Sequence, residues 1–230
     1  MMRRKLFGPF LILVAGSIHA GGGVLEINVA CRSAGCFPGD ASGAPIQITE
    51  PGSYILTSDL SVNVNTTAIL IQTDDVTLDL NGFTISGPVS CTDDRPTNCN
   101  QSGIGIGIDA GGQTNVTIRN GVVRGMGSAG VVANGRGARI TDLTVSENAG
   151  DGLLLSGSGA LARGVSATLN GASGIVSGGA ATVMDSHAIS NAEFGMTGLV
   201  CSNSAMTANE FGSNCVAILP NLCDDPADCD

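Results

Sequence analysis

The chain has 230 residues, with twenty acidic side chains against ten basic ones and no tryptophan. Three of the basic residues stand in the first five positions, so the chain without residues 1–20 would carry a formal charge of −13. Nucleic-acid binding needs a basic stripe, and this composition excludes one. An anionic polymer would also be repelled, unless calcium bridged the carboxylates or the arginines clustered.

The first twenty residues predict a secretory signal peptide. Arg3, Arg4 and Lys5 form a basic start, a short apolar run follows from residue 10 to 15, and Ala20 is a plausible cleavage position. The apolar run is too short to span a bilayer, and no second run of membrane length follows. We therefore expect a secreted or periplasmic protein without membrane insertion.

The rest of the chain divides into three parts. Residues 21–45 are Gly-rich and predict an N-terminal leader and cap, because a solenoid must cover its terminal coil. Residues 46–215 predict one solenoid, interrupted at residues 88–103 by a polar insertion. Residues 216–230 form an acidic tail that contains cysteines.

A repeat of about 22 residues runs through the centre of the chain. Its coil-opening glycines, Gly130, Gly152, Gly174 and Gly195, are 22, 22 and 21 residues apart. A fixed period of this length is typical of a solenoid. Each repeat has short alternating apolar runs but no uninterrupted stretch long enough for a helix, so we expect three short strands per coil in an all-β stack.

Columns of equivalent residues support this interpretation. One column is apolar throughout and is expected to point inward: Ile108, Val131, Leu153, Ile175 and Met196. A second is small or apolar: Val145, Ala167, Ala188 and Met206. Its neighbour is mostly polar and is expected to face outward: Thr144, Ser166, His187 and Ala205.

A column of asparagines keeps the same phase. Asn148, Asn170 and Asn191 each precede a coil-opening glycine by four residues. Asparagine tolerates the left-handed backbone conformation that a sharp bend requires, and stacked asparagine side chains can hydrogen-bond along a ladder. We interpret this column as structural.

The repeat resembles that of the right-handed parallel β-helix proteins of the pectate-lyase-like superfamily. The segment from Val76 to Gly87 and the segment from Asn115 to Gly121 are similar to the opening coils of bacterial β-helix-repeat proteins, most of them uncharacterised. The resemblance covers roughly residues 45–215 and implies a single right-handed parallel β-helix of about seven coils with disulfide-bonded ends and one inserted loop. It does not imply one activity, because the superfamily includes lyases, hydrolases, epimerases and adhesins.

The even number of cysteines behind a signal peptide predicts disulfide bonds. Nearest-neighbour pairing would join Cys31–Cys36, Cys91–Cys99, Cys201–Cys215 and Cys223–Cys229, which is one of 105 connectivities. Zinc is the alternative, but the chain has no Cys-x-x-Cys and only one histidine after the signal peptide.

The inserted loop offers the first candidate site. Asp93, Asp94 and Arg95 could contact a sugar, and the two carboxylates could hold calcium, the one cofactor that the sequence suggests. The alternative is a solvated loop tip. A second acidic group, Asp74, Asp75 and Asp79, is explained by a turn and by a charge pair between Asp79 and Arg119 on the next coil.

Two further candidates are catalytic. Arg119, Thr141 and Arg163 are 22 residues apart and should share an outward column. In β-helix lyases an Arg or Lys abstracts a proton beside a calcium-bound uronate, so the resemblance allows this role for Arg119 or Arg163, although no matching carboxylate cluster is evident. His187 and Asp185 are expected on one strand and face, where they could form a general base.

Other motifs of the superfamily are absent. The chain has neither the Gly-His-Gly of its glycoside hydrolases nor the Asp-Pro-His-Asp of its mannuronan epimerases. Sugar-binding grooves favour aromatic rings, and the chain has one Tyr and six Phe. Two hypotheses remain: a β-helix protein that binds, or acts on, a polysaccharide, and a non-catalytic structural or surface-interaction module.

Overall fold

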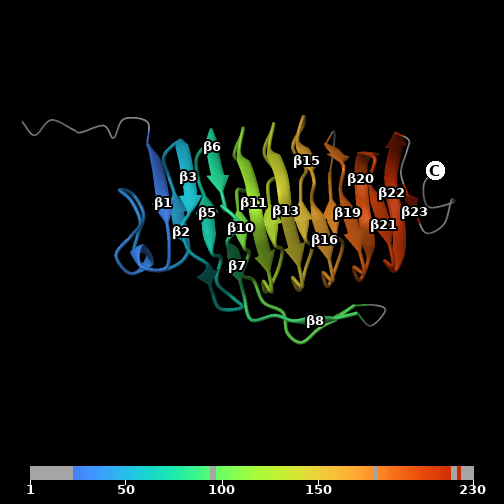
Figure 1. Cartoon of the computed structure of the whole chain (residues 1–230), viewed down its shortest axis with the longest axis horizontal. Helices are drawn as coiled ribbons and strands as arrows, with labels where there is room; N and C mark the ends of the chain where they lie inside the picture. The colour runs from blue at the N-terminus through green and yellow to red at the C-terminus, as the bar shows by residue number, and fades with distance from the viewer. Residues whose placement is uncertain (1–22, 94–96, 179–180, 219–221, 224–230) are drawn as a thin grey trace, which may run out of the picture.

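The computed structural model describes residues 23–93, 97–178, 181–218 and 222–223. The chain winds into a parallel β-helix of about seven turns, whose coils stack along one axis from β1 at one end to β22 and β23 at the other (Figure 1). The helical residues among those described are a short 3-10 turn, η1 (Cys31–Ser33). The predicted all-β solenoid is confirmed, while the predicted signal peptide lies outside the described residues.

Each coil contributes one strand to each of three parallel ladders, which we call faces 1, 2 and 3 in chain order. Face 1 contains β2 (Ile46–Ile48), β5 (Ile69–Ile71), β10 (Ile108–Asp109), β12 (Val131–Val132), β14 (Leu153–Leu154), β17 (Ile175–Val176), and the first parts of β20 (Phe194–Ser202) and β22 (Phe211–Ile218).

Face 2 contains β1 (Val24–Ile27), β3 (Gly52–Leu56), β6 (Val76–Asp79), the first parts of β11 (Thr117–Arg124) and β13 (Arg139–Ser146), then β15 (Leu161–Arg163), β18 (Thr182–Met184) and the later parts of β20 and β22. Face 3 contains β4 (Leu60–Ser61), β7 (Thr84–Ser86), the later parts of β11 and β13, β16 (Ser166–Thr168), β19 (His187–Ile189), β21 (Ala205–Thr207) and β23 (Leu222–Cys223).

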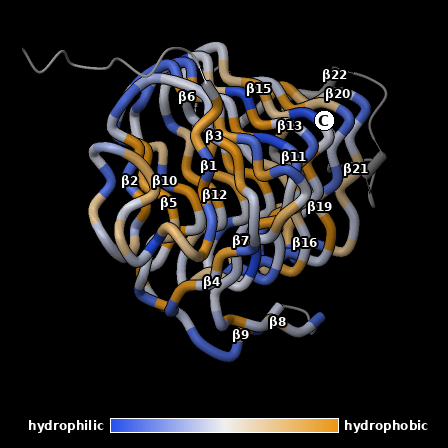
Figure 2. The backbone as a smooth tube through the Cα atoms, turned by 60° about the vertical axis from the view of Figure 1, so that its left-hand side comes forward, coloured by the Kyte–Doolittle hydropathy of each residue, from blue (hydrophilic) through white to orange (hydrophobic). Residues whose placement is uncertain are grey.

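The inward columns form the core. Ile108, Val131, Leu153, Ile175 and Met196 pair in register from coil to coil, and each is fully buried. Figure 2 shows the hydrophobic residues on the strands of the stack. Burying one large aliphatic side chain stabilises a fold by roughly 1.5–3 kcal/mol, and each coil repeats this contribution.

The asparagine column forms a buried hydrogen-bonded ladder, as predicted. The Nδ2 of Asn148 donates to Oδ1 of Asn170 at 2.9 Å, and Asn170 repeats this contact to Asn191 at 2.9 Å. Asn209 continues the ladder at 2.9 Å, although the shortened last repeat hides it in the sequence. These side chains bond across coils, so they hold the stack in register.

The conformational reason proposed for this column is wrong. The left-handed residues are those one position earlier, Glu147, Leu169 and Ser190, with φ between 53° and 55°. The preceding residue makes the bend because each asparagine has to direct its amide into the interior. Left-handed asparagines occur instead at other corners, at Asn81, Asn115 and Asn120.

The ladder explains why glycine opens each coil. A Cβ added to Gly152 would lie 2.8 Å from Nδ2 of Asn170 and 2.6 Å from the carbonyl oxygen of Gly174. The same crowding occurs at Gly130, Gly174 and Gly195, each against the asparagine of the following coil. The two sequence columns are in phase because they occupy one crowded corner.

The stack has one capping strand at its first coil and three disulfide bonds among its described residues. Strand β1, within the segment predicted as a cap, pairs in parallel with β3 and so covers the first coil. The disulfides Cys31–Cys36, Cys91–Cys99 and Cys201–Cys215 form, which confirms these three predicted pairs. The predicted Cys223–Cys229 pair lies outside the described side chains.

Candidate functional site

The outward column of face 2 contains the predicted arginines. Arg119 pairs with Asp79 of the preceding coil and Thr141 of the next, and Thr141 pairs with Arg163, as the spacing predicted. The Nη2 of Arg119 lies 3.0 Å from Oδ2 of Asp79. The predicted charge pair between Asp79 and Arg119 is therefore confirmed.

Arg163 is neutralised in a similar way. Its Nε donates to Oδ2 of Asp185 at 3.0 Å, and the Nδ2 of Asn203 donates to the other oxygen of the same carboxylate at 2.7 Å. The hydrogen bond from Asn203 is the largest cause that lowers the pKa of Asp185, and Arg163 adds to it, while partial desolvation opposes both. These contacts give Arg163 a carboxylate partner on the outside of face 2.

His187 and Asp185 do not share a strand. Asp185 adopts a left-handed conformation, with φ of 53°, in the turn between β18 and β19, while His187 begins β19. The expected placement on one strand and face is wrong, because the corner between faces 2 and 3 separates them. His187 is exposed on face 3 between Ser166 and Ala205.

Face 3 carries hydroxyl groups in two outward columns, which are interrupted by Val122 and Arg124 of β11 and by His187 and Ile189 of β19. Its strands bury only the central residue and leave the flanking ones half-buried on the outside, as in β7, β16 and β21. We call these outward residues the hydroxyl face, and its hydroxyl-bearing members are Ser61, Thr84, Ser86, Thr144, Ser146, Ser166, Thr168 and Thr207. Parallel strands set neighbouring members about 4.8 Å apart.

The other two faces differ in chemistry. The outward column of face 2 carries the charged pairs just described. The outward column of face 1 includes the apolar residues Leu70, Val132, Leu154 and Val176. Hydroxyl groups also lie on face 2, where Ser53, Thr77 and Thr117 are in register, but there they share the outer surface with the two arginine–aspartate pairs. On face 3 the hydroxyls of two adjacent coils lie side by side and can both donate and accept hydrogen bonds.

The inserted loop folds into an antiparallel hairpin of β8 (Cys91–Thr92) and β9 (Asn98–Cys99). The sulfur atoms of its disulfide lie 3.9 and 3.8 Å from the carbonyl oxygen of Asn148, and the hydroxyl of Thr97 donates to the carbonyl oxygen of Ser190 at 2.8 Å. Figure 1 shows the hairpin running along the long axis of the stack. It thus borders the corner between faces 3 and 1 over several coils.

Of the three residues predicted on this loop, the structure describes only Asp93. Asp93 is exposed, and Asp94 and Arg95 lie outside the described residues. Contact of this loop tip with sugar or calcium stays a prediction. Within residues 23–93, 97–178, 181–218 and 222–223, no group of three or more His, Cys, Asp or Glu side chains is arranged to hold a metal ion.

One carboxyl pair was missed by the sequence analysis. Asp151 and Glu193 lie on either side of Ser173, whose backbone N–H donates to Asp151 at 2.9 Å and whose hydroxyl donates to Glu193 at 3.4 Å. Burial is the main cause that raises the pKa of Asp151; the Ser173 hydrogen bond opposes this, and the charge of Glu193 adds to it. The spacings of 22 and 20 residues placed these positions in adjacent coils, but no motif marked them as a pair.

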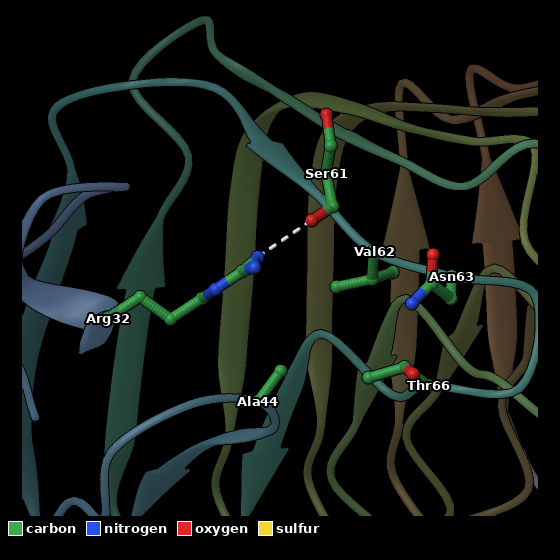
Figure 3. Close-up of a pocket in the computed structure, with 6 residues that line it drawn as sticks. All are labelled: Arg32, Ala44, Ser61, Val62, Asn63 and Thr66. Atoms are coloured by element: carbon green, nitrogen blue, oxygen red, sulfur yellow. Dashed lines mark hydrogen bonds between the residues drawn. The ribbon is translucent and has the colours of Figure 1, made fainter.

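A cleft at the N-terminal end was also missed. It has a volume of about 360 Å³ and is lined by Arg32, Ala44, Ser61, Val62, Asn63 and Thr66 (Figure 3). The Nη1 of Arg32 donates to the carbonyl oxygen of Ser61 at 2.7 Å. Arg32 lies outside the repeat, so no column of equivalent residues could have indicated its place.

Comparison with known proteins agrees with this architecture. A family model described as a right-handed β-helix region matches residues 104–219. The A-module of the Azotobacter vinelandii mannuronan C-5 epimerase AlgE4 is a similar solved structure, with 14% identity over 83% of this chain and 69% of that one and a TM-score of 0.34. No curated protein matches the chain. None of the helices in the described part of the chain has the length and apolar character needed to cross a bilayer.

Proposed function

Because the chain belongs to the right-handed β-helix family, its coils hold side chains in fixed rows, and we propose that it binds a polysaccharide on the hydroxyl face without acting on it. The observation that carries this proposal is the register of Thr144 with Ser166 and of Ser146 with Thr168, which aligns hydroxyl groups over successive coils. The hairpin supplies a wall beside this face.

The chemistry of the face fits an extended, uncharged glycan. A hydroxyl group both donates and accepts, as sugar hydroxyls do, so the two adjacent coils that carry Thr144 with Ser146 and Ser166 with Thr168 can offer similar hydrogen bonds to neighbouring units of a polymer. One such bond contributes only about 1 kcal/mol, so useful affinity requires contacts over several coils. The formal charge of −10 disfavours an anionic chain on this face.

A binding role is better supported than catalysis. Arg119 and Arg163, the two candidate bases, are each paired with a carboxylate at 3.0 Å. His187 has no carboxylate on its own strand, because Asp185 points to Arg163 and Asn203. The contacts of Arg119 and Arg163 explain both side chains as ion-pair partners between neighbouring coils.

Glycan-array binding tests the proposal. The triple variant Thr144→Val, Ser166→Ala, Thr168→Val removes three hydroxyls from the hydroxyl face and should weaken binding about a hundredfold, from roughly 1 kcal/mol for each lost bond. A matched control, Thr117→Val, Thr141→Val, Thr182→Val, removes three hydroxyls from strands of face 2 and should leave the affinity unchanged.

The results separate the two hypotheses. Equal affinity of the face 3 variant and the native chain would rule out the hydroxyl face as the binding surface. Absence of any glycan binding by the native chain would leave the structural or surface-interaction module. Incubation with pectate and alginate in calcium, followed by ultraviolet absorbance of unsaturated products, should show no turnover; turnover would contradict the non-catalytic assignment.

A further inference from the structure

We infer that the cleft around Arg32 is a binding site for a small hydroxy acid, whose carboxylate would pair with Arg32 and whose hydroxyls would contact Asn63 and Thr66. The cleft volume of about 360 Å³ lies at the small end of the range for ligand pockets. The cleft shares Ser61 with the hydroxyl face, but Arg32 contacts the backbone carbonyl of Ser61 and not its hydroxyl. The coils that carry Thr144, Ser166 and Thr168 follow later in the stack, and the inference does not rest on the proposed glycan contact.

Arg32 is the first observation that points to an anion. Among the described residues, Arg119, Arg124 and Arg163 lie within ion-pairing distance of a carboxylate, and Arg32 does not. Arg136 and Arg139 also lack such a partner, but they are exposed, whereas Arg32 is half-buried in the wall of a cleft. Arg32 therefore lines a cleft with donors that a bound carboxylate would pair with.

The geometry leaves one edge of the guanidinium available. Arginine has five N–H donors in a planar fork, and the bond from Nη1 to the carbonyl oxygen of Ser61 uses one of them. Figure 3 shows the side chain extending across the cleft toward Ser61. The remaining donors suit a carboxylate, which accepts two parallel hydrogen bonds from this fork.

Arg32 is held in place by its backbone. The Cys31–Cys36 disulfide closes the segment that contains it, and its carbonyl oxygen accepts a hydrogen bond from the N–H of Gly43 at 2.7 Å. A fixed site loses less entropy on binding than a mobile one. The cleft is thus organised before a ligand arrives.

The other lining residues define the rest of the ligand. Asn63 and Thr66 close a turn through a backbone bond of 3.0 Å, and their side chains border the cleft. None of the described residues that line the cleft carries a carboxylate, so these residues would not repel an anion. One cation in a chain of net negative charge favours a singly charged carboxylate over a doubly charged phosphate.

Calorimetric titration of the full chain with gluconate, acetate, glucose and inorganic phosphate tests the inference. Gluconate should bind saturably and more weakly as salt rises, and glucose should not bind. Acetate binding as tightly as gluconate would support the carboxylate contact but would overturn the contacts to hydroxyls. Phosphate binding more tightly than gluconate, or no saturable binding of gluconate, would overturn the site.

Substitutions at Arg32 and Thr66 test whether these two side chains contact the ligand. Arg32→Gln should weaken gluconate binding at least tenfold, and Thr66→Val should weaken it about fivefold while leaving acetate unaffected. Arg136→Gln, which removes an exposed arginine, is the matched control and should bind normally. Thermal melting checks that each variant folds; if Arg32→Gln did not fold, unchanged gluconate affinity in Thr66→Val would still overturn the proposed hydroxyl contact.

Discussion

The side-chain amide of Asn148 donates to Oδ1 of Asn170 at 2.9 Å, although 22 residues separate them in the chain. Both side chains are fully buried. Oδ1 of Asn170 also accepts the backbone N–H of Asn148, and its Nδ2 donates to the carbonyl oxygen of Val145. One asparagine therefore joins two coils through backbone and side chain together.

Removing this asparagine should destabilise the fold strongly. Asn170→Ala leaves buried donors of Asn148 without an acceptor, and each unsatisfied group costs about 1–3 kcal/mol. We expect the free energy of unfolding to fall by roughly 3 kcal/mol or more, measured by urea denaturation. Asn134→Ala is the control, because Asn134 is exposed and should change stability by less than about 0.5 kcal/mol. Equal effects of the two variants would contradict the ladder's role.

A methyl group at a coil-opening glycine should be poorly tolerated. In Gly152→Ala the new Cβ would approach Asn170 and the backbone of Gly174, so the corner must shift at a cost of about 1–3 kcal/mol. Gly112→Ala meets nothing within 4 Å and should be neutral or slightly stabilising. Urea denaturation of both variants checks this. A neutral Gly152→Ala would show that crowding at the corner does not select glycine.

Asp151 should make stability depend on pH. Burial raises its pKa in the folded protein, so between its ordinary and its raised pKa the folded state holds more protons than the unfolded state. Stability then falls as pH rises through this window and stays reduced above it. Asp151→Asn keeps an acceptor for Ser173 and removes the charge, so it should raise the melting temperature at neutral pH.

The pH dependence of that gain is the decisive measurement. The gain should shrink as the pH falls through the window between the raised and the ordinary pKa, and it should be absent below about 4, where the carboxyl group is protonated in both states. Glu193→Gln should reduce the gain, because the charge of Glu193 also raises the pKa of Asp151. A gain that is the same at all pH values would show that ionisation of Asp151 is not its cause.

Asp185 should respond in the opposite direction. Its lowered pKa means that its contribution to stability is present above the unfolded pKa and is lost as pH falls through the folded one. Asn203→Ala and Arg163→Gln should each raise the pKa of Asp185, measured by carboxyl NMR titration, because each removes a contact that lowers it. An unchanged pKa in either variant would show that the contact removed does not hold the carboxylate.

Much of the scaffold was predictable because every coil of a solenoid repeats the same local structure. Val131, Leu153 and Ile175 occupy equivalent positions in sequence and stack directly on one another in space. The same periodicity predicted the pairing of Arg119 with Asp79, even across the insertion at residues 88–103. The register of a parallel stack is determined between adjacent coils, because each strand pairs only with the equivalent strands of the coils before and after it.

The corners and the ends were less predictable. The sequence suggested that Asp185 and His187 share a face. Asp185 itself adopts a left-handed conformation, which places it at the corner between faces 2 and 3, where its carboxylate accepts a hydrogen bond from Arg163. The pattern of alternation does not encode where a strand ends, because the same residues alternate on both sides of such a bend. The identity of the left-handed residue before each buried asparagine was missed for the same reason.

By itself, the sequence determined the architecture: the 22-residue period, the apolar columns and the neighbouring cysteines require coils that stack and are bridged at their margins. Only the tertiary structure decided which groups meet outside the repeat, namely the hairpin against Asn148 and Ser190 and the side chain of Arg32 against Ser61. The physical reason is that periodic contacts are specified once per coil, whereas a contact made once depends on the path of a non-repeating segment over the finished surface.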